Sequence, residues 1–281
     1  MACDSTQLYR GFDIGTAKPT AQERAGVPHR LLDVLDAEET ATAGGYREKA
    51  IQVLAEMRER NKLPIFTVGT GLYLRALLLG LAEVPLRSEE LRERLRASAA
   101  KHGPVYLHHL LEKLDSAGSK KISPRDQQKL IRAAEVCLLA KKPLSEVYEI
   151  GRKPLEGWRA IKVGLHPPRE KLMQRVNART ESMLQRGWME EVRGLMQRPN
   201  NDQAKAFDFI GYRELREVCR AQKTLHDARA AIQQATRQYA KRQVTWFRKE
   251  PGVHSLNGFG EEAQIRDQAL AFIKRNWLQE K

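Results

Sequence analysis

The sequence predicts an α/β protein in which helices cover a parallel sheet and a helical insertion interrupts the chain. Three observations support this prediction. Near the start, a helix pattern over 46–60 is followed by a short apolar run over 63–68, a Gly-Thr-Gly turn and a second helix pattern over 72–81. These elements together make half of an α/β unit. Strand character returns at 160–165, where apolar and polar residues alternate. Residues 87–157, which lie between them, have no convincing strand pattern.

Each remaining element has a local signal of its own. The run 63–68 lies between breakers, as buried parallel strands do. After Pro167-Pro168 the periodicity predicts helices over 168–186, 188–197, 211–220 and 225–248, a short strand over 253–256 and a final helix over 261–277. The composition changes after Pro85. This change divides the chain into an α/β core, residues 1–86 and 158–281, and the insertion, residues 87–157.

Composition excludes several classes of protein. The 281 residues are 41% hydrophobic and 30% charged, as in a globular protein. Three cysteines without a CxxC pair argue against a disulfide framework or a zinc knuckle, and no GxSxG or HxxxH pattern occurs. No signal peptide or membrane span is predicted, so we expect a cytoplasmic protein. The net charge of +14 favours a polyanionic partner such as nucleic acid, or serves solubility alone.

The first motif, residues 4–19, places an acid, two hydroxyls and an amide after a predicted strand end: Asp4, Ser5, Thr6 and Gln7. Sheets of this class bind ligands at that edge, and a carboxylate there could accept a proton or hold a metal ion. The alternative is a capped loop. The Gly69-Thr70-Gly71 turn could present backbone N–H groups to a phosphate, but it is not a Walker A loop, and its glycines could be purely conformational.

Two predicted helices carry basic faces. Arg125, Gln128, Lys129 and Arg132 share a face in the insertion, whereas Ile131, Ala134 and Leu138 lie on another. Over 225–248, Arg237, Lys241 and Arg248 form a stripe with Arg242 beside it. Such faces are either solvated or grip one long phosphate backbone. Arg213, which follows Gly211-Tyr212, could hold a phosphate or form a surface ion pair.

The order of the motifs closely resembles the bacterial tRNA dimethylallyltransferase family, from Ala2 to about Lys249. The matching motifs are DSTQLYRGFDIGTAKP from Asp4, HRLLD from His29, VGTGLYLRALLLGL from Val68, RAAEV from Arg132, IGYRE from Ile210 and RQYAKRQVTWFRK from Arg237. The resemblance implies a P-loop NTPase-like parallel sheet core, related to nucleotide kinases, with a helical insertion that closes over tRNA. It also implies Mg²⁺, nucleotide binding and a monomer.

The activity implied by the resemblance is transfer of the dimethylallyl group from dimethylallyl diphosphate to N6 of adenine 37, in the anticodon stem-loop of tRNAs that read codons beginning with U. By similarity, Asp4 takes the N6 proton, Thr70 hydrogen-bonds near the reacting centre, and Arg213 contacts the diphosphate. Lys129 stands where the family often has arginine. The expected tRNA contacts are Asp4, Ser5, Thr6, Gln7, Thr70, Arg92, Gln128, Lys129, Leu130, Ile131, Arg132, Arg237, Gln238, Lys241 and Arg242.

One departure from the family concerns the start of the sequence. The family has a strand, a GPTxSGK[ST] loop and a helix before the segment that matches Ala2–Ser5, roughly thirty residues that hold the diphosphate cradle and the expected metal ligand. We therefore expect Met1 to be an internal methionine or a misplaced start. Two alternatives follow: a tRNA-binding protein without catalysis, or a nucleotide kinase, against which the basic insertion and the missing Walker A loop argue.

Overall fold

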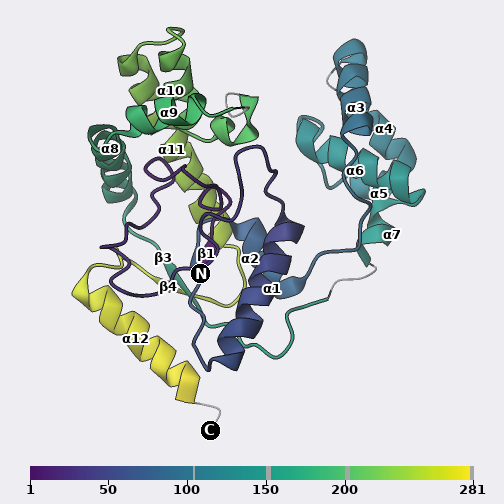
Figure 1. Ribbon diagram of the computed structural model, residues 1–281. Coiled ribbons are helices and arrows are strands. Elements are labelled where there is room, and N and C mark those ends of the chain that lie inside the picture. Colours follow the sequence, from purple (N-terminus) through teal and green to yellow (C-terminus); the bar gives the residue numbers. More distant parts are fainter. Residues whose placement is uncertain (104, 150–152, 200–202, 279–281) are drawn as a thin grey trace. The chain divides into compact units, whose positions relative to one another are not determined.

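The computed structural model describes residues 1–103, 105–149, 153–199 and 203–278 (Figure 1). The chain divides into two compact units. Unit 1 comprises Met1–Leu77 and Gly157–Lys281, and unit 2 comprises Leu78–Glu156. Each unit has buried apolar residues of its own, so each has its own hydrophobic core.

Unit 1 begins with a two-stranded parallel sheet. Strand β1 (Ala2–Cys3) pairs with β2 (Thr67–Val68), so that Ala2 lies opposite Thr67 and Cys3 opposite Val68. The Met1 ammonium group adds a hydrogen bond of 2.6 Å to the Ile65 carbonyl. The short ladder brings the carboxyl ends of two strands that are far apart in sequence to one edge.

A second parallel pair lies elsewhere in unit 1. Strand β3 (Lys162–Leu165) pairs with β4 (Val253–Leu256) along its whole length. The sequence predicts a parallel sheet, and the strands of the described residues are parallel, although they form two separate two-stranded sheets. The predicted strand over 63–68 is too long. Only its last two residues have a partner strand, and Leu63 and Ile65 are exposed.

Two helices flank the first sheet. Helix α1 (Ala43–Glu59) begins after Thr42, whose hydroxyl accepts a hydrogen bond from a backbone N–H of the first turn. Helix α2 (Gly71–Leu79) follows β2. Tyr46 of α1 stacks on Tyr73 of α2, with ring centroids 4.6 Å apart, and its hydroxyl donates to the Ala2 carbonyl at 3.1 Å. The stacked rings therefore fix both helices against the strand that precedes Asp4.

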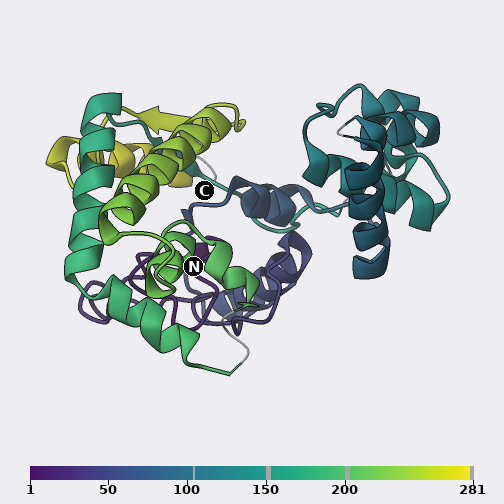
Figure 2. The same ribbon diagram turned by 90° about the horizontal axis from the view of Figure 1, so that it is seen from above.

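The later helices of unit 1 were predicted to within two residues of their ends. They are α8 (Arg169–Gln185), α9 (Trp188–Met196), α10 (Tyr212–Cys219), α11 (Leu225–Phe247) and α12 (Ala263–Leu278). The structure adds a 3₁₀ turn, η2 (Lys205–Asp208), which the sequence did not predict. Helix α11 packs beside both α8 and α10 (Figures 1 and 2). Helix α12 contacts β4.

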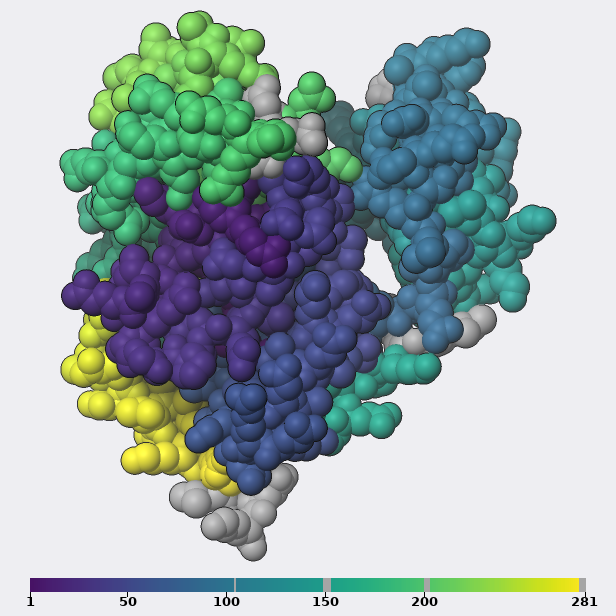
Figure 3. Space-filling model, viewed as in Figure 1, coloured from purple at the N-terminus to yellow at the C-terminus, as the bar shows by residue number. Residues whose placement is uncertain are grey.

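An aromatic cluster joins the N-terminal loop to these helices. Phe12, Phe207 and Tyr212 are fully buried, and their rings meet edge-to-face or tilted. Trp188 lies against Gly15 and Gly211. A Cβ added to Gly15 would lie 2.2 Å from the Trp188 Nε1 atom, and one added to Gly211 would lie 2.0 Å from its ring. Both positions therefore require glycine. The segment before α1 covers much of this unit's face in Figure 3.

The described residues of unit 2 form helices and loops and no strand, as its sequence predicts. Its helices are α3 (Glu89–His102), α4 (Tyr106–Leu114), α5 (Ser116–Ser119), α6 (Gln127–Ala140) and α7 (Leu144–Glu149). The core lies mainly between α3, α4 and α6, where Leu107, Leu111 and Leu130 are almost completely buried. Helix α6 contributes most of the buried side chains.

Across the described part of the chain, no helix is both long enough and apolar enough to cross a membrane.

Candidate active site

Two polar turns meet at one edge of the β1–β2 sheet. Asp4 directly follows β1, and Gly69 and Thr70 directly follow β2. Because the strands are parallel, their carboxyl ends share an edge. The Cys3 carbonyl accepts hydrogen bonds from the N–H groups of Gly69 at 3.0 Å and Thr70 at 2.9 Å. The Asp4 turn and the Gly-Thr-Gly turn, which lie about sixty residues apart in sequence, therefore form one site.

The two oxygens of the Asp4 carboxylate have different surroundings. Oδ1 accepts hydrogen bonds from the Thr6 N–H at 2.9 Å and from the Thr6 hydroxyl at 2.7 Å. Oδ2 faces Gly69, where an added Cβ would lie 2.3 Å away, and it has no hydrogen-bond partner among the described residues. One oxygen is therefore held in place while the other keeps its lone pairs for a ligand.

Thr70 holds the Asp4 turn from the other side. Its hydroxyl accepts a hydrogen bond from the Ser5 N–H at 3.0 Å and donates to the Ser5 hydroxyl at 3.3 Å. The Gln7 side chain lies further along and donates to the carbonyls of Thr16 at 3.1 Å and Ala17 at 3.2 Å. The predicted residues Asp4, Ser5, Thr6 and Thr70 are thus brought together, whereas the Gln7 amide nitrogen bonds within its own loop.

Helix α11 covers the Gly-Thr-Gly turn, which the sequence reasoning missed. The Gly69 carbonyl accepts hydrogen bonds from Gln243 Nε2 at 2.8 Å and from the Tyr239 hydroxyl at 3.5 Å. The Trp246 ring lies against Gly71, where an added Cβ would be 2.3 Å away. Burial and the nearby Asp4 charge raise the pKa of Tyr239. Tyr239, Gln243 and Trp246 are spaced by four and then three residues along α11. This spacing places them on one helix face, and it was the signal in the sequence that could have placed that face against the site.

The remainder of the first motif supports the Asp4 turn. The Lys18 side chain is almost fully buried, and its ammonium group donates to the Tyr9 carbonyl and to Oδ1 of Asp13 at 2.7 Å and of Asp33 at 2.5 Å. A buried cation is stable only with such partners. Lys18 therefore ties the loop that follows Asp4 to the His29–Asp33 segment.

Glu191 of α9 anchors the same loop from the opposite side. Its carboxylate accepts hydrogen bonds from the N–H groups of Asp13 at 3.0 Å and Ile14 at 2.8 Å. It also accepts one from the Tyr212 hydroxyl at 2.6 Å. Burial, followed by the charge and hydrogen bond of Glu191, raises the pKa of Tyr212 far above its ordinary value, so this phenol stays protonated as a donor.

The comparison of the whole sequence with family models decides the family. Residues 7–250 match the model described as IPP transferase. The chain belongs to the IPP transferase family. This confirms the resemblance read from the motifs and makes the chain a member of a family of enzymes.

Similar proteins agree with this family membership. A "tRNA dimethylallyltransferase" from Koribacter versatilis is 49% identical over 97% of this chain and 88% of that protein. The crystal structure of a tRNA isopentenylpyrophosphate transferase from Staphylococcus epidermidis matches with a TM-score of 0.67 and 31% identity, over 98% of this chain and 89% of that chain. A eukaryotic dimethylallyltransferase described as acting on tRNA matches with a TM-score of 0.75 over 98% of this chain and 72% of that chain, and at 24% identity it shows the shared fold.

In this IPP transferase family member, the basic end of α11 lies beside the Asp4 site. The predicted tRNA contacts Gln238, Lys241 and Arg242 are exposed there. The Arg242 guanidinium lies over the Tyr239 ring, 5.6 Å from its centroid. The Arg237 side chain is already engaged within the protein, because it donates a hydrogen bond to Asn177 Oδ1 of α8 at 2.7 Å. The helix that covers the Gly-Thr-Gly turn thus presents cations around the site.

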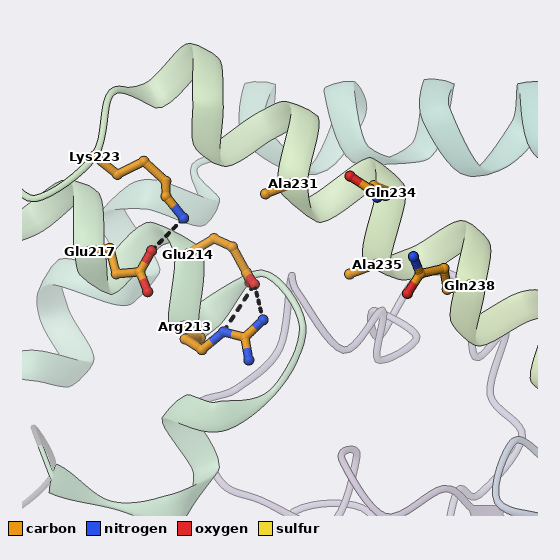
Figure 4. Close-up of a pocket in the computed structure, with 8 residues that line it drawn as sticks. All are labelled: Arg213, Glu214, Glu217, Lys223, Ala231, Gln234, Ala235 and Gln238. Atoms are coloured by element: carbon orange, nitrogen blue, oxygen red, sulfur yellow. Dashed lines mark hydrogen bonds and ion pairs between the residues drawn. The ribbon is translucent and has the colours of Figure 1, made fainter.

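Arg213 lies in a different environment, a polar cavity of about 450 Å³ between α10 and α11 (Figure 4). Its guanidinium donates to Glu214 Oε1 at 2.6 and 3.1 Å, and Glu217 pairs with Lys223 at 2.5 Å across the same cavity. Glu214 also accepts a hydrogen bond from the Gly211 N–H at 2.7 Å. Of the two roles considered for Arg213, the structure contains the ion pair; the diphosphate contact stays a prediction.

In unit 2, two predicted tRNA contacts surround a buried glutamate. Glu135 is completely buried and accepts hydrogen bonds from Arg92 Nε at 3.0 Å, Arg132 Nη1 at 2.6 Å and the Ser88 N–H at 2.8 Å. Burial by itself would raise the pKa of Glu135, but the hydrogen bonds from these groups outweigh it and lower the pKa below its usual value. Arg92 and Arg132 therefore stabilise the fold of this unit, whatever else they contact.

The stretch 128–132 does not act as one surface. Gln128 and Lys129 are exposed, and Lys129 pairs with Asp126 at 2.6 Å. Leu130 and Ile131 are 0% and 5% exposed in the core of unit 2. The turn of the helix points these two side chains away from the exposed side, and the tRNA contacts predicted for all five residues stay predictions.

A metal site is not apparent in the chain's own side chains. Among the described residues, no three His, Cys, Asp or Glu side chains gather closely enough to hold an ion. The described side chains thus do not form a Mg²⁺ site by themselves, and the expected Mg²⁺ stays a prediction.

Proposed function

We propose that this chain transfers the dimethylallyl group of dimethylallyl diphosphate to N6 of adenine 37, in the anticodon stem-loop of tRNAs that read codons beginning with U. The observation that supports this most directly is the Asp4 carboxylate, with one oxygen fixed by Thr6 and the other free of hydrogen bonds from described residues. The names of the relatives and the family membership point to the same chemistry.

The chemistry follows from this geometry. The adenine leaves the stacked anticodon loop so that its amine can reach the carboxylate. The N6 lone pair attacks C1 of the dimethylallyl group while the C1–O bond breaks, and the electron pair of that bond goes to the diphosphate. The N6 proton passes to Oδ2 of Asp4, so the transfer ends with neutral product amine and free diphosphate. Thr6 keeps the carboxylate in place during this step, and Thr70 holds the turn that carries it through Ser5.

The tRNA would be held by the basic surface of the chain. The net charge is +14, and exposed Lys241 and Arg242 lie on the helix that covers the Gly-Thr-Gly turn. Exposed Gln128 and Lys129 offer a second contact from unit 2. Phosphate contacts of this kind position an RNA without reading its bases, so selection of adenine 37 falls to the Asp4 site. We further propose that the protein acts as a cytoplasmic monomer.

We also propose that the fold is of the P-loop NTPase type, with a nucleotide-kinase-like parallel sheet. Both ladders, β1–β2 and β3–β4, are parallel, and helices connect their strands, which supports this assignment. The same type of fold places ligands at the carboxyl ends of its strands, where Asp4 and Thr70 lie. Mg²⁺ would join this site through one or two carboxylates and the substrate phosphates, as it commonly does.

The test is a prenyl-transfer assay with purified protein, labelled dimethylallyl diphosphate and tRNA. The substitution Asp4→Asn keeps the size of the side chain but removes the proton acceptor, so we expect kcat to fall about 10²- to 10⁴-fold. Asp36→Asn is the matched control, because Asp36 is exposed and its side chain pairs with Arg10. An unchanged rate in Asp4→Asn would refute the mechanism. A wild-type chain that binds tRNA but leaves it unmodified would support the non-catalytic alternative.

A further inference from the structure

A buried carboxylate follows α11 and binds two cations. The Glu250 side chain is 3% exposed, and each of its oxygens accepts a hydrogen bond: Oε2 from Arg75 Nε at 2.9 Å and Oε1 from Lys162 Nζ at 2.7 Å. Burial by itself would raise the pKa of Glu250, but these hydrogen bonds outweigh it and lower the pKa, so the group is charged at neutral pH. Because Arg75 belongs to α2 and Lys162 to β3, the carboxylate joins both elements to the end of α11.

The Lys162 side chain connects the carboxylate to the second sheet. Its ammonium group also donates to the Pro251 carbonyl at 2.9 Å, and its backbone lies opposite Val253 in the β3–β4 ladder. Both of these acceptors, Glu250 and Pro251, lie in the segment between α11 and β4. Lys162 therefore stabilises the path of the chain into β4.

Arg75 instead contacts the aromatic ring that covers the Gly-Thr-Gly turn. Its guanidinium carbon lies 4.5 Å from the centroid of the Trp246 ring, as in a cation–π contact. The same ring lies against Gly71, where an added Cβ would be 2.3 Å away. Gly71 and Arg75 are four residues apart in α2 and share a helix face. The Trp246 ring therefore packs along the face of α2 that begins at the turn.

The Gly-Thr-Gly turn, in its own right, determines where Asp4 lies. The Thr70 hydroxyl accepts the Ser5 N–H at 3.0 Å, and Gly69 lies directly against Asp4 Oδ2. The N–H groups of Gly69 and Thr70 both donate to the Cys3 carbonyl, one residue before Asp4. A shift of the turn would therefore move the carboxylate.

We propose that Arg75 is a positioning residue for prenyl transfer. Glu250 orients its guanidinium, and the guanidinium holds the Trp246 ring on the Gly-Thr-Gly turn. The turn in its fixed place then keeps the Asp4 carboxylate where it can accept the N6 proton. This inference rests on the proposed function. Arg75 acts on the reaction through the turn, and the rate is sensitive to it because small displacements of a reacting group are costly.

A contact with an RNA phosphate is the other role open to this arginine, because its side chain is 43% exposed. The geometry favours positioning, since Nε is bonded to Glu250 and the guanidinium lies over Trp246. The two roles affect different constants. A phosphate contact lowers the affinity for tRNA when it is lost, whereas loss of positioning lowers the rate of the chemical step.

The test compares two variants that each remove one cation from the same carboxylate. Arg75→Gln breaks the connection to the turn, so we expect kcat for prenyl transfer to fall about 10- to 100-fold while the KM values for tRNA and dimethylallyl diphosphate stay within about twofold of wild type. Lys162→Gln is the matched control. It should lower the melting temperature, because Glu250 loses a partner, yet keep kcat within about twofold of wild type.

Two results of this comparison would overturn the proposal. One is an equal loss of kcat in Arg75→Gln and Lys162→Gln, since the loss would then follow stability alone. The other is a rise in the KM for tRNA with unchanged kcat in Arg75→Gln, which would indicate a phosphate contact.

A double substitution separates positioning from a general loss of structure. If Arg75 acts through Asp4, then Arg75→Gln should lower kcat no further in a chain that already carries Asp4→Asn. A merely structural role would lower kcat by the same factor in both backgrounds, and that result would contradict the proposal.

Hydrogen exchange gives a readout that does not depend on turnover. The Gly69 and Thr70 amides donate to the Cys3 carbonyl, so their exchange reports how firmly the turn is held. We expect both amides to exchange about tenfold faster in Arg75→Gln than in wild type, and at the wild-type rate in Lys162→Gln. Unchanged exchange in Arg75→Gln would refute the positioning role. Absence of prenyl transfer by wild type would instead refute the proposed function, while the exchange rates would still decide whether Arg75 holds the turn.

Discussion

The close approach of Asp4 to Gly69 gives a sharp test of the active-site geometry. In Gly69→Ala the new Cβ would start 2.3 Å from Asp4 Oδ2, whereas ordinary contact begins at 3.4 Å. The carboxylate must therefore move by about 1 Å. It is the far end of a short flexible side chain, so it can rotate aside without disturbing the backbone. We expect the protein to fold normally and to lose catalysis.

The magnitude follows from the demands of proton transfer. A displacement of about 1 Å at a reacting group costs about 100-fold in rate, so kcat for prenyl transfer should fall by that factor in Gly69→Ala. The free energy of unfolding, measured with urea, should change by less than about 1 kcal/mol. Gly194→Ala is the matched control: it lies inside α9, and an added Cβ meets nothing within 4 Å. It should keep full activity and gain about 0.5–1 kcal/mol of stability.

Two results would refute this reasoning. If Gly69→Ala kept a kcat within threefold of wild type, the position of the carboxylate would not limit the reaction. If Gly69→Ala unfolded at much lower urea concentration, the strain would lie in the backbone and the loss of activity would say nothing about Asp4.

The remaining predictions concern stability. Replacing Glu135 by Gln should cost about 3 kcal/mol at neutral pH in urea unfolding, because it leaves the partly buried guanidinium groups of Arg92 and Arg132 without their carboxylate. The pKa values of Glu135 and Glu250 are lowered in the folded state, so both carboxylates stabilise it above about pH 4.5, the ordinary glutamate value. This stabilisation is lost as the pH falls towards the folded pKa. If the stability cost of Glu135→Gln did not shrink below about pH 4.5, this reasoning would be contradicted. Gly211→Ala should lower stability by about 3 kcal/mol, because its Cβ would meet the Trp188 ring and its φ is +93°; a wild-type melting temperature would disprove that packing.

The parts of the fold that depend on local signals were predictable. Helices such as α10 and α11, and strands β3 and β4, carry periodicity or alternation within their own residues, and their observed ends lie within two residues of the predicted ones. The sheet arrangement was not predictable in the same way. A strand exists only where another strand pairs with it, so the apolar run 63–68 shortened to the two residues opposite β1.

The candidate site shows the same division. Asp4 and Thr70 follow strands in the sequence, and their proximity follows once the strands pair in parallel. Tyr239 and Gln243 were missed because tertiary packing of α11 brings them to the site. The burial of Leu130 and Ile131 did not follow from treating the motif as one contiguous segment, because successive helical residues point in different directions.

The anchoring of the Asp4 loop has a consequence for how this protein is made. The loop is fixed by Trp188, Glu191 and Tyr212; the Tyr212 hydroxyl, for instance, accepts a hydrogen bond from the N–H of Gly15, 197 positions earlier. Contacts so distant along the chain form late and slow the folding reaction. During synthesis, Asp4 therefore stays without its final geometry until the ribosome has released the much later segments that carry Trp188, Glu191 and Tyr212.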